Sequence, residues 1–262
     1  MSECLKNKPF IDFSKDYYAP DLPNKPTQIQ IYNADIYEHI ASIPDNSIDL
    51  IITDPPYILS RAGGQWADLV GGIVYKELIS KHETLGKGFD FSLLDELERI
   101  QSNVNAYIFC NQKLLNKLIA YYESKPHLTA EVLIWHKTNA RPHPRNRYNL
   151  DIEFILYVYD KGGYLDTTQS GFDSRVFTHS IMNSFNKHTT HPTEKPLKLI
   201  ENLVLNSSKE GDRVLDCFMG SGTTAHACKS LNRNFIGYEI DEQYFKMVEK
   251  RLATQCQGKL IL

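Results

Sequence analysis

The stretch "RVLDCFMGSGTTAHAC" (Arg213–Cys228) reads as a short apolar strand, a glycine turn and the start of a helix. Gly220 and Gly222 allow a tight turn and a close approach of the backbone to a ligand. The hydroxyl side chains that can cap the helix are Ser221, Thr223 and Thr224. This order predicts one unit of an α/β sheet, with the turn at the carboxyl end of the strand, where such sheets bind ligands.

Residues that the stretch lacks exclude some ligands of this turn, and the residues beside it favour another. A triphosphate-binding loop needs a lysine after the glycine, and the dinucleotide fingerprint fails because Ala225 occupies the place of its third glycine. Asp216 on the strand and Glu239 after the next strand can accept hydrogen bonds from ribose hydroxyls. A helix N-terminus favours an anion such as an amino acid carboxylate. These features indicate S-adenosylmethionine, and the alternative is a turn that only packs the helix.

Apolar strand-like runs recur along the chain, and several precede amphipathic, helix-like stretches. The runs are Ile29–Asn33, Ile48–Asp54, Val104–Cys110, Ala130–Lys137, Ile152–Asp160, Arg213–Phe218 and Asn234–Ile240. Their alternation with helices predicts a single doubly wound α/β domain over residues 1–262, with a mostly parallel sheet covered on both faces. No helix-like stretch separates the runs that begin at Ala130 and Ile152, which predicts an antiparallel hairpin at one edge. Residues 58–88 and 162–190 fit this pattern poorly, and long loops of this kind in a compact domain are either functional or disordered.

A second motif, "IITDPPYILS" (Ile51–Ser60), leaves a strand through two prolines. Because proline has a fixed φ and no backbone donor, Pro55 and Pro56 can neither extend the sheet nor easily begin a helix. The rigid tip holds Asp54 on one side and Tyr57 on the other in set directions. The alternative is an acid that ends a strand beside a packing tyrosine.

The bulk composition is that of an ordinary globular protein, with 42% hydrophobic and 23% charged residues. No apolar run is long enough for a membrane span, and the N-terminal stretch lacks the apolar core of a secretory signal, so we expect a cytoplasmic protein without membrane contact. Five cysteines without a C-x-x-C pair predict reduced thiols and no metal site. The net charge of −3 does not by itself indicate a nucleic-acid partner.

One local stretch, "HKTNARPHPRNR" (residues 136–147), is strongly basic and contains no acid. Its cationic side chains are Lys137, Arg141, Arg145 and Arg147. By charge alone it is either a solvated loop or a strip that contacts phosphates.

Three motifs together resemble the S-adenosylmethionine-dependent amino methyltransferases of DNA. "TDPPY" (Thr53–Tyr57) is similar to their catalytic motif, and "LDCFMGSGTT" (Leu215–Thr224) is similar to their cofactor motif. Cys217 departs from that motif, because it stands where the family usually has proline. "HPTEKP" (His191–Pro196) is similar to the motif that leads into a helix. The catalytic motif comes first, which is the circularly permuted order of the β-class enzymes, so the resemblance implies a Rossmann-like methyltransferase fold.

The resemblance also implies which residues hold the cofactor. They are Asp35, His191, Lys195, Asp216, Phe218, Gly220, Ser221, Gly222, Thr223 and Glu239. Within this set Glu239 would hold the ribose and Asp35 would lie near the adenine, while His191 and Lys195 would reach the methionine carboxylate. The alternatives are a helix N-cap for Asp35 and a solvated lysine at a helix start for Lys195.

For the chemistry, the resemblance implies transfer of a methyl group to an exocyclic amine of a flipped base in double-stranded DNA. Asp54 and the Pro55 carbonyl would each accept one amine hydrogen, Pro56 would keep the tip stiff, and Tyr57 would stack on the base. An acid in the first position of the motif favours adenine N6, and the alternatives are cytosine N4 or an amine of RNA or protein. A nucleotide-binding module without catalysis is the non-enzymatic alternative.

The expected partners follow from the same resemblance. Lys137, Arg141, Arg145 and Arg147 would contact phosphates, and residues 162–190, with Arg175, would form a short target-recognition segment. A cognate restriction endonuclease and a homodimer are further expectations.

Overall fold

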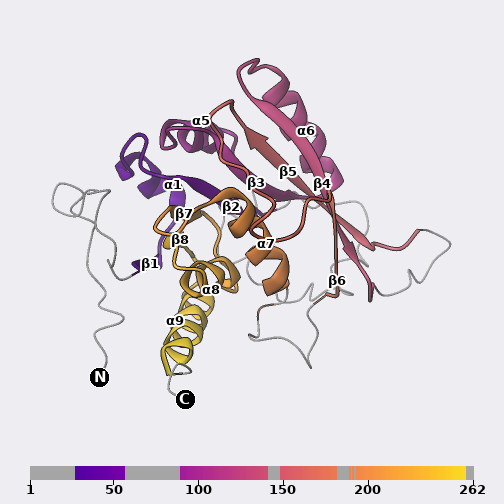
Figure 1. The fold of residues 1–262 in the computed structure, drawn as a ribbon. Coiled ribbons are helices and arrows are strands. Elements are labelled where there is room, and N and C mark those ends of the chain that lie inside the picture. Colours follow the sequence, from indigo (N-terminus) through magenta and orange to yellow (C-terminus); the bar gives the residue numbers. More distant parts are fainter. Residues whose placement is uncertain are drawn as a thin grey trace.

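An eight-stranded sheet forms the centre of the chain in a computed structural model (Figure 1), which describes residues 27–56, 89–140, 148–181, 189, 191 and 193–257. The strands are β1 (Ile29–Tyr32), β2 (Leu50–Thr53), β3 (Asn105–Cys110), β4 (Thr129–Lys137), β5 (Ile152–Tyr159), β6 (Val176–His179), β7 (Arg213–Asp216) and β8 (Asn234–Tyr238). Their order in the sheet is β1-β8-β7-β2-β3-β5-β4-β6. Only β5 among them runs antiparallel to its neighbours, β3 and β4.

Helices cover both faces of this sheet (Figure 1). The helices are α1 (Ile36–His39), the 3-10 turn η1 (Ile40–Ser42), α5 (Ser92–Arg99), α6 (Gln112–Glu123), α7 (Leu197–Ser207), α8 (Thr223–Ser230) and α9 (Glu242–Gln257). One buried cluster joins α1, α5 and α6 to the sheet, and a second joins α7, α8 and α9 to its other face. The result is a three-layer, doubly wound α/β domain.

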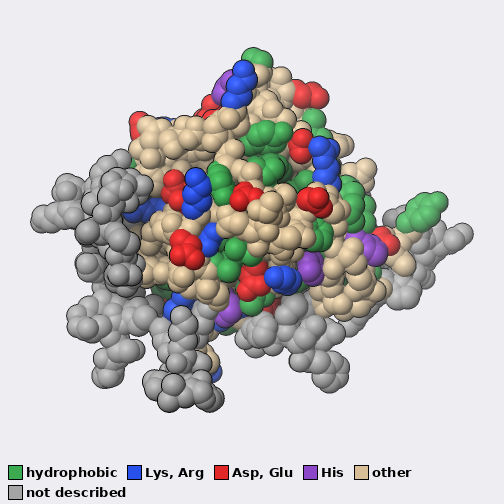
Figure 2. Space-filling model, in the orientation of Figure 1, with side chains coloured by type: hydrophobic (Ala, Val, Ile, Leu, Met, Phe, Trp, Pro, Cys, Tyr) green, Lys and Arg blue, Asp and Glu red, His purple; other side chains and the backbone are tan. Residues whose placement is uncertain are grey.

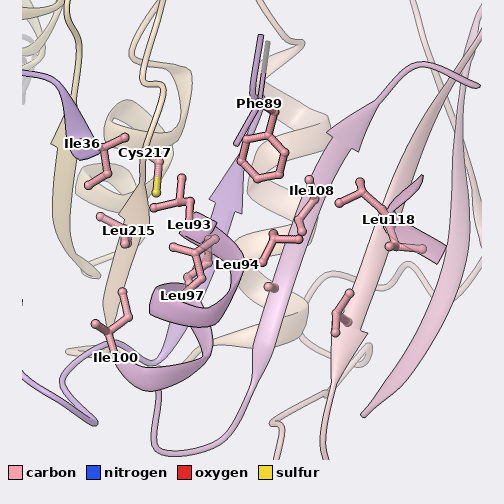
Figure 3. Packing of buried hydrophobic residues seen from close by; sticks show 14 of the residues in the cluster. Ile36, Phe89, Leu93, Leu94, Leu97, Ile100, Ile108, Leu118, Leu215 and Cys217 are labelled. Carbon is pink, nitrogen blue, oxygen red and sulfur yellow. The ribbon is translucent and has the colours of Figure 1, made fainter. Parts of the chain in front are cut away.

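The alternation of side chains along each strand produces these two cores. In β2, Ile51 faces the first cluster, whereas Leu50 and Ile52 face the second, and the whole strand is buried. Cys217 lies in the first cluster and points toward Ile36 and Leu93 (Figure 3). A strand that is buried on both faces needs a near-continuous apolar sequence, as the sequence pattern predicted.

The predicted antiparallel hairpin is confirmed, because β4 and β5 pair from Thr129 with Tyr159 to His136 with Ile152. It does not, however, form the last strands of the sheet. β6 pairs in parallel with β4, and the Trp135 indole donates to the His179 carbonyl at 2.9 Å. The interpretation of residues 162–190 as irregular throughout is therefore wrong at β6, since the exposed edge of β4 supplies the hydrogen bonds that a short polar strand needs.

The segment between β5 and β6 is anchored at the amino ends of the parallel strands, at the start of β3. The Asn105 amide at the start of β3 donates to the carbonyls of Tyr164 and Ser207, both at 3.0 Å. Arg233 donates to the Ser208 carbonyl at 2.7 Å in the same region. The first part of residues 162–190 is thus held by buried polar contacts at the start of β3. Among the described residues of this segment, β6 then runs in the same direction as β4, toward the carboxyl ends of the parallel strands.

The surface and the helices add two observations. Acidic and basic side chains are interspersed over the described part of the face in Figure 2. Among the described residues, no helix is long and apolar enough to cross a membrane. The expected loop at residues 58–88 lies outside the described residues.

Candidate active site

The site lies where β7 has β8 on one side and β2 on the other. The connections on the two sides lead away from each other, and ligands bind beyond the carboxyl ends of strands at such a point. Ile51 of β2 pairs with Leu215 of β7, so Asp54, which follows β2, emerges beside the glycine turn that follows β7. Burial is the main cause of the raised pKa of Asp216, and the nearby Asp54 charge also contributes.

Asp54 is held by a chain of ion pairs. The Lys195 ammonium donates to Asp54 Oδ2 and lies 2.9 Å from Glu153 Oε1. Glu153 Oε2 lies 2.7 Å from the ammonium of Lys137. Burial alone would lower the pKa of Lys195, but the Asp54 and Glu153 carboxylates outweigh it and raise that pKa. Burial would likewise raise the pKa of Glu153, but Lys195 and Lys137 outweigh it and lower that pKa, so Glu153 is ionised near neutral pH.

The glycine turn has the backbone that its sequence predicted. Gly220 and Gly222 have φ values of +51° and +68°, in the left-handed region that glycine adopts without strain. The Met219 amide donates to the Tyr238 carbonyl at 2.9 Å, which ties the turn to the end of β8. A Cβ at Gly222 would lie 2.6 Å from Val248 Cγ1 of α9, so this position excludes side chains by both conformation and space.

Two buried acids flank the turn. Glu239 Oε2 accepts from the Gly220 amide and Oε1 accepts from the Asp241 amide, both at 2.8 Å. Asp216 accepts from the Thr224 hydroxyl at 2.8 Å and from the Phe218 amide at 3.2 Å. Burial is the main cause that raises the pKa of both acids to about 7. Each oxygen of Glu239 retains a lone pair, so this carboxylate can still accept from ligand hydroxyls.

A second buried ion pair supports the turn from α9. Arg251 Nη1 donates to the Ser221 carbonyl at 2.8 Å and to the Thr223 hydroxyl at 3.1 Å. The same nitrogen lies 3.3 Å from Glu194 Oε1, and Glu194 Oε2 accepts from the Thr189 amide at 3.0 Å. The last helix therefore fixes the position at which α8 begins.

The other residues expected at the cofactor gather at the same edge. His191 packs against the turn, since a Cβ at Gly220 would lie 3.1 Å from its Nε2. Asp35 caps α1 by accepting from the Tyr37 amide at 3.0 Å, as the alternative interpretation predicted. The adjacent residue, Ala34, donates to the Glu239 carbonyl at 3.1 Å, so Asp35 also lies near the end of β8.

Phe218 and Lys195 complete the expected cofactor set. The Phe218 ring packs between Tyr37 and Phe89, with centroids 6.4 and 6.3 Å away. Lys195 is buried and is therefore not a solvated lysine. Its ammonium lies on Asp54, so its contact with a cofactor carboxylate stays a prediction, as do the ligand roles of the other members.

The residues expected to contact DNA do not form one surface within the described chain. Lys137 is paired with Glu153, whereas Arg175 lies 2.9 Å from Glu131 Oε1. Glu131 is six residues before Lys137, about 20 Å along β4. The other expected phosphate contacts lie outside the described residues; they are Arg141, Arg145 and Arg147. The tyrosine expected to stack on the base, Tyr57, also lies outside them. Pro55 and Pro56 follow Asp54 at the end of β2.

Sequence reasoning missed Glu153, Glu194 and Arg251. Glu153 is an acid inside the apolar run "IEFILYVY", and a charge in a buried strand indicates a partner. Glu194 adjoins Lys195 in the helix-leading motif, but no pattern in α9 distinguishes Arg251 from its other basic residues. Within the described part of the chain, no group of three or more His, Cys, Asp or Glu side chains could hold a metal ion.

Comparison with known proteins agrees with this geometry. Residues 48–250 match the model of a family described as DNA methylase, which covers N6 and N4 amino methyltransferases. The chain is 31% identical to Type II methyltransferase M.HpaI of Haemophilus parainfluenzae over 84% of this chain and 72% of that protein. It is 30% identical to M2.DpnII of Streptococcus pneumoniae over 92% and 94%. The crystal structure of the M1.HpyAVI–SAM complex superposes with a TM-score of 0.64 at 30% identity, over 86% of this chain and 99% of that one.

Substitution of the turn glycine tests its geometry. Gly222→Ala adds both left-handed strain and a contact with Val248, whereas Gly171→Ala, at a φ of +65° with open space around it, adds the strain alone. We expect a loss of about 1–2 kcal/mol in the free energy of unfolding for Gly171→Ala and about 1–3 kcal/mol more for Gly222→Ala. Denaturant unfolding of both variants measures this difference, and equal losses would contradict the packing of α9 against the turn.

The raised pKa of Glu239 predicts how pH affects cofactor binding. If ribose hydroxyls donate to ionised Glu239, its pKa falls from about 7 on binding, and affinity for S-adenosylmethionine rises between pH 6 and 8. Glu239→Gln should weaken binding by about 10-fold or more and flatten the pH dependence. Calorimetry at several pH values measures both effects. Asp212→Asn, which changes another acid with a raised pKa at the start of β7, is the control, and an unaltered profile in Glu239→Gln would remove Glu239 from the site.

Proposed function

The chain belongs to the DNA methylase family of amino methyltransferases, and from that membership we propose that it methylates N6 of an adenine flipped out of duplex DNA. Methylation of DNA is the activity of this family. The proposal rests on one observation above all: Asp54 and the glycine turn emerge side by side from β2 and β7. Amine methylation requires a hydrogen-bond acceptor for the amine next to the site that holds the methyl donor, and Asp54 and the glycine turn provide this pair.

The residues around the turn fit S-adenosylmethionine, which when bound supplies a methyl group on a positively charged sulfur. Glu239 has lone pairs left for the ribose hydroxyls. Gly220 and Gly222 give the turn its tight left-handed backbone, and the amino end of α8 favours the cofactor carboxylate. His191 lies against the same turn.

The exocyclic amine of adenine is a poor nucleophile because its lone pair is delocalised into the ring. Asp54 accepts one amine hydrogen and the Pro55 carbonyl accepts the other. Two acceptors on one amine favour a pyramidal nitrogen and direct its lone pair away from them, toward the cofactor. Fixed orientation of this kind lowers a barrier by several kcal/mol. Once methylated, the nitrogen is cationic and loses a proton readily.

The target base must leave the duplex to reach this edge, because base pairing and stacking hide its amine. Tyr57 stacks on the flipped base next to the rigid prolines. Phosphates are contacted by the basic strip that begins at Lys137, whose ammonium has three N–H donors and can bind a phosphate while it stays paired with Glu153. Arg175 and residues 162–190 contribute to target recognition.

Adenine is favoured over cytosine N4 because the motif begins with an acid, although the family covers both amines. RNA and protein amines are weaker alternatives. The relatives named as Type II methyltransferases support a cognate restriction endonuclease as a partner, with the enzyme acting in the cytoplasm. A homodimer would enlarge the small recognition segment.

Substrate and base can be tested together. Purified protein is incubated with radiolabelled S-adenosylmethionine and with unmethylated duplex DNA, RNA or a protein extract. Digestion of the DNA to nucleosides should place the label in N6-methyladenine. Label in N4-methylcytosine would replace adenine with cytosine, and label confined to RNA or protein would overturn the proposal.

The role of Asp54 predicts a loss of chemistry without a loss of cofactor. Asp54→Asn keeps a similar shape but removes the charged acceptor, and we expect single-turnover transfer to slow by about 100-fold or more. Its affinity for S-adenosylmethionine should change little. The matched control is Asp49→Asn. Asp49 lies just before β2, at the opposite end of this strand from Asp54, and its variant should transfer normally. A near-normal rate in Asp54→Asn would refute the assigned role.

A further inference from the structure

The ion pairs behind Asp54 extend across three neighbouring strands beyond β2. The order of contact is Asp54 after β2, Lys195 before α7, Glu153 on β5 and Lys137 on β4. We propose that Glu153 is a positioning residue for the methyl transfer: it holds the Lys195 ammonium against one oxygen of Asp54 and so leaves the other oxygen directed at the amine. This inference rests on the proposed role of Asp54.

The sheet geometry explains why a lysine is needed between the two acids. β3 lies between β2 and β5, so the strands that carry Asp54 and Glu153 are about 10 Å apart. At that distance the two carboxylates make no contact, so a cationic side chain between them is needed to hold both. Lys195 enters from the segment before α7 and bridges them, with its ammonium 5.0 Å from the centroid of the Phe109 ring on the intervening strand.

Alternation along the strands puts the whole chain of charges on one face. Register pairs Trp135 with Glu153 and Phe109 with Ile155, and all these side chains face α7. Lys137 follows Trp135 by two residues and its ammonium lies 4.8 Å from the Trp135 ring centroid. Because Lys137 engages the second oxygen of Glu153, both oxygens of that carboxylate are fixed.

Glu153 is needed because Lys195 is buried. The side chains of Lys195 and Glu153 are only 11% and 13% exposed, whereas that of Asp54 is 28% exposed. Moving an ammonium out of water is unfavourable unless opposite charges offset the loss of hydration. With Asp54 as its only carboxylate partner, Lys195 would either lose its proton or turn toward solvent, and Asp54 would then lose this ion pair.

The arrangement helps Asp54 in two ways. The adjacent ammonium donates to one oxygen of Asp54, and a carboxylate can accept hydrogen bonds at both oxygens. One oxygen is occupied by Lys195, so the carboxylate plane is fixed while the other oxygen accepts from the amine. The same positive charge disfavours retention of the extra proton on the methylated nitrogen, which therefore passes to water.

The charged and titratable groups around Lys195 lie on four strands and at the end of a fifth, β2. They are Asp54, Glu153, Lys137, the Cys110 thiol on β3 and Asp216 on β7. Burial raises the pKa of Cys110 to about 12, and that of Asp216 is about 7. Between pH 8 and 10 neither should change its protonation, so a new titration in this range after loss of the Glu153 charge comes from a lysine that Glu153 held. Its effect on the transfer rate at saturating DNA points to Lys195, which contacts Asp54.

The test compares Glu153→Gln with Glu98→Gln in the full chain. Glu98 also binds two basic side chains, Lys125 and His127, but lies on α5, away from the site. Single-turnover methylation of duplex DNA is measured from pH 6 to 10 at saturating DNA and cofactor. Glu153→Gln should slow transfer about 10- to 100-fold and should lose further rate between pH 8 and 10, with unchanged affinity for S-adenosylmethionine. Glu98→Gln should match the unaltered protein.

A wild-type rate and pH profile in Glu153→Gln would overturn the inference. A slower rate with an unshifted pH profile and an equal loss of cofactor affinity would also overturn it, because Glu153 would then be only structural. Lys137→Gln, which leaves Glu153 with one partner, is the second variant if Glu153→Gln does not fold, and it should slow transfer less at saturating DNA. An absence of DNA methylation by the unaltered protein would instead refute the proposed function.

Discussion

The parallel pairing of β2 with β7 is the constraint on which the site depends. It brings the ends of two strands that are distant in sequence to one edge, with Asp54 on one strand and the glycine turn after the other. Because side chains alternate along a strand, the pairing also fixes which residues face α7. Tertiary contacts from α7 and α9 then complete the positions that the strands provide, through Lys195 and Arg251.

The order of the motifs in the chain has no effect on this geometry. Catalytic and cofactor elements are neighbours in the sheet because β7 lies beside β2, whichever of the two strands comes first in the sequence. What the connection between them must do is deliver the helix-leading segment to the carboxyl edge. β4, β5 and β6 achieve this by extending the sheet on one side, after which the chain returns through His191 to α7.

Local patterns were enough to predict the sheet, the tight glycine turn and the placement of Asp54, Asp216 and Glu239 at strand ends, because each depends on neighbouring residues or on strand ends. They were not enough for β6, whose four residues pair only because the edge of β4 is exposed. Nor could they predict the contact of Lys195 with Asp54, since a lysine before a helix can equally bind an anion or point to water. Ion pairs between distant segments follow from tertiary packing, which a local pattern does not contain.

The helix-leading motif links the two halves of the site through neighbouring side chains. The residue before α7, Pro196, has an extended backbone, and the two residues before it send their side chains to different partners. Glu194 turns toward Arg251 and the glycine turn, whereas Lys195 turns toward Asp54. Both side chains are buried, and removal of either partner from a buried pair leaves an uncompensated charge. A displacement of this short segment would therefore disturb the acceptor and the cofactor turn at the same time, which explains why one motif before α7 serves both.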